Sequence, residues 1–235
     1  MRKLLPMLVV LLAASAAHAG PRPLPPSDKE GSADNPLFKR FDGSIILSYE
    51  HKHLAEFTLP LSQLERVPDK KDSHNNNYFE PKKSKSLEGA YTHLVYLLPM
   101  DRSPLEVVRY YQAEVKAKGG TILYECKAPE CGGDPTGNVQ GGGGNLSLGQ
   151  YLYPAERVTD PYPTIAWCAN AGSVVDTRYM AAELPARGAH LSVLTMILPN
   201  ADGDCELLRG RTIVRVDIIE GKAPENKKPA RAKRR

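Results

Sequence analysis

The sequence predicts an α+β domain with a mixed, mainly antiparallel sheet and one well-defined packed helix at about residues 103–118. That helix has a complete set of start and stop signals. Residues 211–219 come close to strict alternation of apolar and polar side chains, as a strand with one packed face does. The helix also stands between two β-prone segments, which predicts a β-α-β unit and a fold that is ferredoxin-like in part.

The N-terminus has the three parts of a secretory signal peptide. Arg2 and Lys3 give it a cationic start, an apolar run extends from Leu4 to Ala14, and Ala17-His18-Ala19 is a small-x-small cleavage site. The apolar run is shorter than the roughly 20 residues that span a bilayer, so we expect export and no membrane span in the mature chain. The expected organisation is a signal peptide at 1–19, a flexible mature N-terminus at 20–34, a single α+β domain at 35–220 and a basic disordered tail at 221–235.

The first elements of the domain are expected to be two strands. Residues 44–51 follow the turn-forming Asp42-Gly43 and are rich in β-prone side chains, and residues 55–61 can form a second strand that ends at Pro60. Together they predict a hairpin. Residues 65–89 are dominated by Lys, Asp, Ser, Asn and Pro, which predicts a mobile surface loop.

The helix at 103–118 is the most clearly defined element. Ser103 can cap it, Pro104 suits its first position and Glu106 completes a capping box. Apolar side chains recur at helical spacing at Leu105, Val108, Tyr111 and Val115, and Gly119-Gly120 ends the helix. Strands are expected on either side, at residues 90–98 and 121–126.

Eight glycines lie between residues 132 and 150, which predicts a second mobile loop. The phosphate-binding pattern G-x-x-x-x-G-K-[ST] is absent from this stretch, so a nucleotide site is not favoured. Four further segments have the character of strands, and they are residues 164–169, 178–183, 190–197 and 211–219.

The four cysteines allow three disulfide pairings in an oxidising compartment. Cys126 and Cys131 can close a local ring at a turn that contains proline, which leaves Cys168 with Cys205, and we favour this pairing. A zinc site is the competing interpretation, but the four-residue gap is wider than the usual C-x2-C spacing. Cys168 beside Trp167 could instead be a nucleophile, although an available disulfide partner makes this the weaker interpretation.

The charge of the chain is unevenly distributed. The formal net charge is +4, yet the signal peptide holds two basic residues and the tail holds seven against one Glu, so the body carries about −4. A nucleic-acid-binding domain is therefore not expected. The tail cations could bind an anionic outer-membrane surface, and they are Lys222, Lys227, Lys228, Arg231, Lys233, Arg234 and Arg235.

Few residues suggest chemistry. His51 and His53 would lie on the same side of a strand and are weak candidates for a metal site, although solvent-facing strand histidines fit equally. His74 and His93 have no partner that the sequence identifies. Asp202 and Asp204 could bind a calcium ion, but the ligand at the far end of a calcium loop is missing. We therefore interpret this segment as a hairpin turn. No catalytic residue and no cofactor is expected.

Residues 32–46, the segment from Ser103 to Tyr111 with the following Gly-Gly, the run Cys126-x4-Cys131-Gly132, and residues 211–220 together resemble an uncharacterised bacterial envelope domain. That domain often precedes an OmpA-like peptidoglycan-binding domain. The resemblance covers about residues 31–221 and implies an envelope location. In this chain the basic tail stands where the peptidoglycan-binding domain would begin, so the resemblance does not carry peptidoglycan binding across.

These observations favour a non-catalytic exported protein, periplasmic or peripherally associated with the outer membrane, that acts as a binding or structural module. Its expected partner is an envelope protein or a cell-wall component. The alternative is a periplasmic small-ligand or metal-binding protein, in which His51 and His53 would converge on a pocket. An enzyme is a further alternative, and both alternatives require polar side chains that converge in one cleft.

Overall fold

A computed structural model describes most of the chain between residues 23 and 221. The described ranges are 23–71, 75–134, 147–154, 157–160, 164–169, 174–199 and 201–221. The predicted signal peptide at 1–19, most of the predicted glycine-rich loop, His74 and the tail cations at 222–235 lie outside the described residues. Within the described part, no helix is long and apolar enough to cross a membrane.

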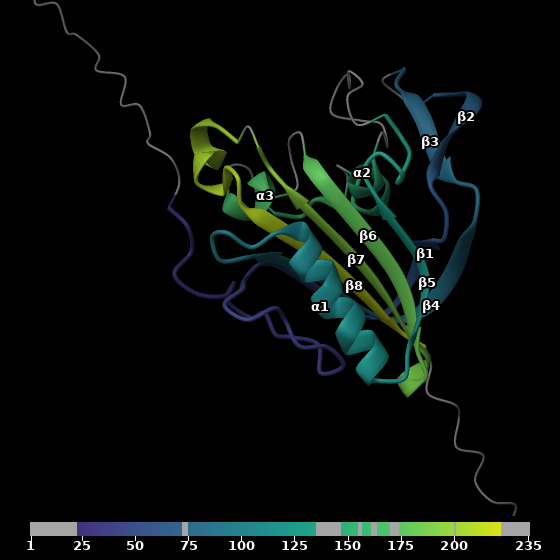
Figure 1. Ribbon diagram of the computed structural model, residues 1–235, viewed down its shortest axis with the longest axis horizontal. Helices are drawn as coiled ribbons and strands as arrows, with labels where there is room; N and C mark the ends of the chain where they lie inside the picture. Colours follow the sequence, from purple (N-terminus) through teal and green to yellow (C-terminus); the bar gives the residue numbers. More distant parts are fainter. Residues whose placement is uncertain are drawn as a thin grey trace, which may run out of the picture.

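The core of the fold is one six-stranded sheet in which every pair of neighbouring strands is antiparallel (Figure 1). Its strands, in spatial order, are β1 (Ile45–Pro60), β4 (Ser84–Leu97), β8 (Thr212–Glu220), β7 (Ala189–Ile197), β6 (Val175–Leu184) and β5 (Thr121–Lys127). Short 3-10 turns, η2 (Ala186–Gly188) and η3 (Gly203–Leu208), connect β6 to β7 and β7 to β8. The predicted α+β class with a mainly antiparallel sheet is confirmed.

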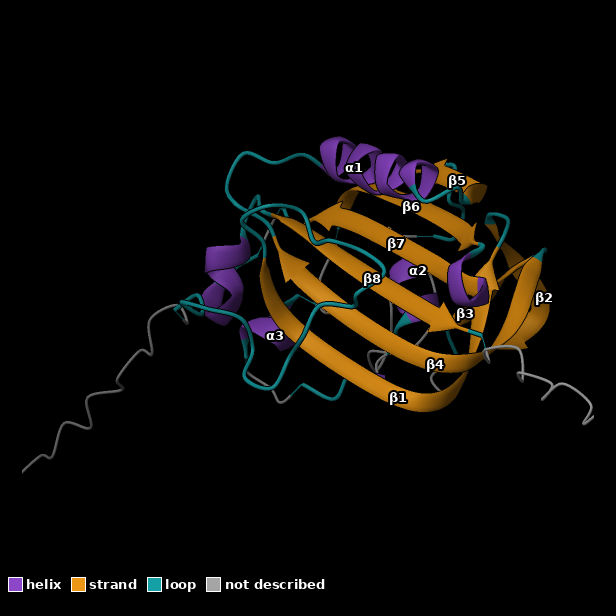
Figure 2. Cartoon of the chain, turned by 90° about the horizontal axis from the view of Figure 1, so that it is seen from below, coloured by secondary structure: helices purple, strands orange, loops and turns teal. Residues whose placement is uncertain are grey.

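Helix α1 (Pro104–Ala117) covers one face of the sheet (Figure 2). The predicted capping box is present, since the backbone N–H of Glu106 donates to the Ser103 hydroxyl while the Glu106 carboxylate accepts from the Ser103 N–H. The buried side of the helix, with Val107, Tyr111 and Val115, packs on alternate residues of the central strands. An amphipathic helix on an antiparallel sheet buries one stripe of the helix and one face of the sheet.

The two strands of the predicted β-α-β unit are not neighbours in the sheet. Strands β4 and β5 flank α1 and run parallel to each other, because four antiparallel steps separate them, but β8, β7 and β6 lie between them. The crossover helix therefore spans three strands. The expected ferredoxin likeness is not confirmed.

Two expectations for residues 44–89 were wrong. The predicted hairpin at 44–51 and 55–61 is one long strand, β1, which pairs throughout with β4. The register of this pairing shifts between Lys52 and Ala55, where β1 contains a bulge. The predicted loop at 65–89 contains β2 (Leu64–Lys71), β3 (Asn77–Pro81) and the first half of β4. Most side chains of β2 are exposed to solvent, which explains why a segment that forms a hairpin has the polar composition of a loop.

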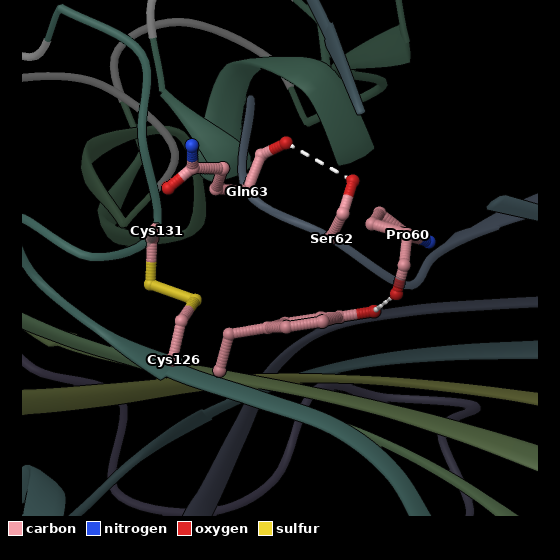
Figure 3. Close-up of a disulfide and its surroundings, with 6 residues drawn as sticks. Pro60, Ser62, Gln63, Cys126 and Cys131 are labelled. Carbon is pink, nitrogen blue, oxygen red and sulfur yellow. Dashed lines mark hydrogen bonds between the residues drawn. A yellow bond between two sulfur atoms is a disulfide. The ribbon is translucent and has the colours of Figure 1, made fainter. Parts of the chain in front are cut away.

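The β2–β3 hairpin closes one end of the sheet against the segment that follows β5. The N–H of Leu64 donates to the carbonyl of Cys131, and the N–H of Gly133 donates to the carbonyl of Leu64. Gly132 lies at φ +73°, and a Cβ there would approach the Leu64 carbonyl oxygen to 2.2 Å, so this contact requires glycine. The Cys126–Cys131 disulfide fixes this segment to β5, and the Tyr179 hydroxyl donates to the Pro60 carbonyl nearby (Figure 3).

The second disulfide joins Cys168 to Cys205, so the favoured pairing is confirmed. It links α3 (Ile165–Cys168) to η3 at one end of the sheet. The predicted strand at 164–169 was wrong, because this segment is the short helix α3, whose first turn is capped by the Thr164 hydroxyl. Its apolar residues face a compact cluster in which a helix can bury them as well as a strand can.

Residues 23–34, within the segment expected to be a flexible N-terminus, contact the rest of the domain. The carboxylate of Asp34 accepts the Tyr96 hydroxyl at 2.9 Å, and both Asp28 and Asp34 pair with Arg40. These partners lie up to 62 residues away, so they could not be identified from the composition of the segment.

Candidate functional site

The sheet face opposite α1 carries a polar layer between two apolar clusters. Strand register places Glu50 opposite His93, His93 opposite Asp217 and Asp217 opposite Ser192, across β1, β4, β8 and β7. One apolar cluster, under α2 (Leu148–Leu152), lies on one side of this row, and the cluster under α3 lies on the other. A row of buried polar side chains in a sheet core needs internal partners.

His93 and Asp217 form the centre of this layer. The His93 Nδ1 lies 2.7 Å from Oδ1 of Asp217, and the same oxygen accepts the Tyr91 hydroxyl at 2.7 Å. Burial, followed by the charge of Asp217, raises the pKa of Tyr91 well above its usual range, so the hydroxyl remains a donor. Tyr153, which follows α2, stacks on the His93 ring with centroids 4.5 Å apart.

Arg215 connects the layer to the elements that cover it. Its guanidinium donates to the carbonyl of Ala169 at 3.0 Å and to the carbonyl of Gly149 at 3.3 Å, so it ties the end of α3 and the start of α2 to the sheet. Burial lowers the pKa of Arg215 to about 10, which leaves the side chain charged at neutral pH. A buried cation that satisfies two helix carbonyls is well placed to fix the position of both short helices.

A groove of about 580 Å³ lies beside this layer, between residues 23–30, the start of β1 and α3. We call residues 23–30 the strap, which is drawn in purple in Figure 1. The apolar wall of the groove includes Leu47, Ile165 and Ala166. The volume lies in the range of small-ligand and peptide-side-chain sites.

Asp160 is the buried charge of this groove. Its side chain is 2% exposed, accepts the Ser48 hydroxyl at 2.7 Å, and pairs with the Lys29 ammonium of the strap at 3.0 Å. Lys29 itself is 40% exposed. Ser48, the hydrogen-bond partner of Asp160, lies two residues before Glu50 on β1, so the groove adjoins the polar layer.

The strap is held by main-chain as well as side-chain bonds. The N–H of Lys29 donates to the carbonyl of Ile46, and the N–H of Ile46 donates to the Asp28 carboxylate, each at 2.9 Å. Arg40 donates to the same carboxylate at 2.7 Å, and this bond lowers the pKa of Asp28. Asp28 therefore links the strap to both β1 and the following loop.

The histidines and cysteines that the sequence suggested as candidate site residues do not line the groove. The rings of His51 and His53 lie 5.5 Å apart on β1, and the Nδ1 of His51 lies 3.2 Å from the Thr92 hydroxyl. Neither lines the groove, and no group of three potential metal ligands occurs among the described residues. All four cysteines are in disulfides, so none is available as a thiol nucleophile.

His93, Arg215 and Asp217 were not predicted to form a polar layer, and Asp160 was not predicted to line a groove. His93 and Asp217 are 124 residues apart and meet only through the pairing of β4 with β8. One signal was available, since Arg215 and Asp217 occupy alternate positions in residues 213–219, whose other side chains are apolar. Charged side chains at strand positions that face a core require a buried partner.

The comparisons with protein-family models and with curated proteins give no match, so the function proposed below depends on the chain's own residues.

Proposed function

We propose that this chain is an exported cell-envelope protein, periplasmic or peripheral to the outer membrane, that acts as a binding module without a catalytic step of its own. The observation that carries this proposal is the groove beside the strap, where an apolar wall surrounds one buried carboxylate. A concave surface with an apolar wall and one buried charge is suited to hold and orient a partner.

The burial of the polar layer supports binding over catalysis. His93 is 1% exposed and Asp217 is 3% exposed, and the Tyr153 ring lies directly on the imidazole. A substrate would have to displace Tyr153 and its helix before it could touch either side chain. The layer is therefore better suited to fix α2 and α3 against the sheet than to transfer protons.

The two disulfides and the signal-peptide pattern support export. The resemblance to a bacterial envelope domain supports the same location. We also propose that the cations of the tail, residues 222–235, attach the protein to anionic outer-membrane surfaces, because a cluster of Lys and Arg gains free energy near such a surface.

Site-specific crosslinking in living cells tests the binding role. A photoreactive residue in place of Ala166, which lines the groove, should form a discrete adduct with an envelope protein or a cell-wall fragment. The matched control is the same residue in place of Ala113, an exposed alanine of α1 on the other side of the sheet. Equal adducts from both positions, or none from Ala166, would argue against the groove as the binding surface.

A further inference from the structure

We infer that the edge of β1 and the groove beside it are a site for an extended polypeptide segment carrying a lysine, and that the strap holds the place of this segment in the free protein. This inference rests on the proposed function and names the chemistry of the partner. It follows from three features of the described residues, which are the exchangeable counter-ion of Asp160, the main-chain groups of Ile46 and the charge of the groove.

The first feature is the ion pair of Asp160. The carboxylate is buried and therefore requires a cation, whereas the Lys29 ammonium that supplies it is 40% exposed. Lys29 can return to water while another ammonium takes its place, so the exchange leaves no buried charge unpaired. Ser48 remains as the second partner of the carboxylate in either case.

The second feature is the position of β1 at the edge of the sheet. Both main-chain polar groups of Ile46 bond to the strap, the carbonyl to the N–H of Lys29 and the N–H to the Asp28 carboxylate. β1 is an edge strand, since only β4 pairs with it in the sheet. An extended peptide that adds to a sheet edge gains its main-chain bonds there and its specificity from a nearby side-chain pocket.

The third feature is charge. Among the described lining residues that do not belong to the strap, Asp160 is the one charged side chain, so this part of the groove is net negative once the strap and its Lys29 are displaced. The apolar wall accepts the methylene chain of a lysine while the carboxylate takes the ammonium. The strap shows this arrangement in place, because it presents Lys29 from a segment bonded to the edge of β1.

The test uses the strap's own sequence as the probe. A peptide with the sequence of residues 23–31 is titrated into the mature full-length protein, either wild type or Asp28→Asn/Lys29→Gln, which loosens the strap. Trp167 is the only tryptophan of the chain and follows Ala166 of the groove wall, so its fluorescence reports binding. A tethered strap competes at an effective concentration of about a millimolar, so we expect the loosened variant to bind the peptide at least about ten-fold more tightly.

Three comparisons make the test specific. A peptide with glutamine in place of lysine should lose most of the affinity, and Asp160→Asn in the loosened background should do the same. If Asp160→Asn proves unstable, Ser48→Ala is the milder variant to use in its place. It removes the other partner of the Asp160 carboxylate and should weaken binding several-fold. Lys118→Gln, which removes an exposed lysine from an ion pair on α1, should bind the peptide as weakly as wild type.

No binding to the loosened variant, equal affinity for wild type and variant, or binding that is indifferent to the peptide's lysine would each overturn the inference. These failures are distinguishable from failure of the proposed function. If the Ala166 crosslinker still captures a partner in cells, the groove binds something other than a lysine-bearing strand.

Discussion

At the scale of single residues, the fold depends on buried charges that are held by hydrogen bonds. Asp217 accepts from His93 and Tyr91 at the same oxygen, and Arg215 on the same strand holds two carbonyls of the covering helices. Burying such groups costs free energy that hydrogen bonds largely offset, so they contribute more to a unique arrangement than to net stability. Removing one partner, however, leaves the others unpaired.

Replacing Asp217 by alanine should therefore be severe. The substitution leaves the Tyr91 hydroxyl and the His93 ring without their acceptor, and we expect a loss of about 3 kcal/mol in the free energy of unfolding, measured by urea denaturation. Glu206→Ala, which removes an exposed carboxylate paired with Arg209, should cost less than about 0.5 kcal/mol. Similar costs for the two variants would contradict the role assigned to the polar layer.

His190 gives the domain a pH dependence of defined sign. Burial lowers the pKa of His190 below its usual value, so protonation favours the unfolded chain. Its contribution to stability is complete above about pH 6.5 and is lost as the pH falls through the lowered folded-state pKa. Between pH 7 and pH 5, His190→Gln should lose less stability than wild type in urea melts, and an equal loss in both proteins would show that His190 is not responsible.

At the scale of elements, the two disulfides differ in how much they stabilise the fold and in which part of it they hold. Cys168–Cys205 closes a sequence separation of 37 residues and Cys126–Cys131 one of 5, so the long bridge should contribute about 4 kcal/mol and the short one about 2 kcal/mol. The short bridge also holds the segment that hydrogen-bonds with Leu64, where the β2–β3 hairpin closes the end of the sheet. Its effect should therefore be local.

Serine pairs in place of each disulfide separate these roles. Cys168→Ser/Cys205→Ser should lower the free energy of unfolding more than Cys126→Ser/Cys131→Ser does. Hydrogen exchange at the Leu64 and Gly133 amides should accelerate only in the second variant, beyond what its lower global stability explains. Acceleration of these two amides to the same degree in both variants would mean that the short bridge does not hold the closure.

The elements with local signals could be predicted, and those defined by distant contacts could not. The helix at 103–118 carries its own caps, and the strand at 211–219 has an alternating pattern, so both were found close to their observed bounds. β2 and β3 were missed because an exposed hairpin has the composition of a loop. The groove was missed because Lys29, Ser48 and Asp160 converge from three separate segments, and nothing in the sequence near any of them indicates the others.

At the scale of the whole molecule, charge is divided between a body of about −4 and a tail with seven cations. Each basic side chain near an anionic membrane contributes about 1 kcal/mol, so the tail could hold the protein peripherally at low salt. Sedimentation with outer-membrane vesicles should show salt-sensitive binding of the mature protein. A variant that lacks residues 222–235 should not bind, and equal binding by both forms, or binding indifferent to salt, would assign attachment to the folded body.

The disulfides and the proposed binding role both depend on export into an oxidising compartment. The most direct measurement is the intact mass of the protein purified from the periplasmic fraction without reductant. We predict a chain that begins at Gly20, with all four cysteines oxidised and no thiol that can be labelled after denaturation. A chain that retains residues 1–19, that carries free thiols, or that is found only in the cytosol would contradict the account.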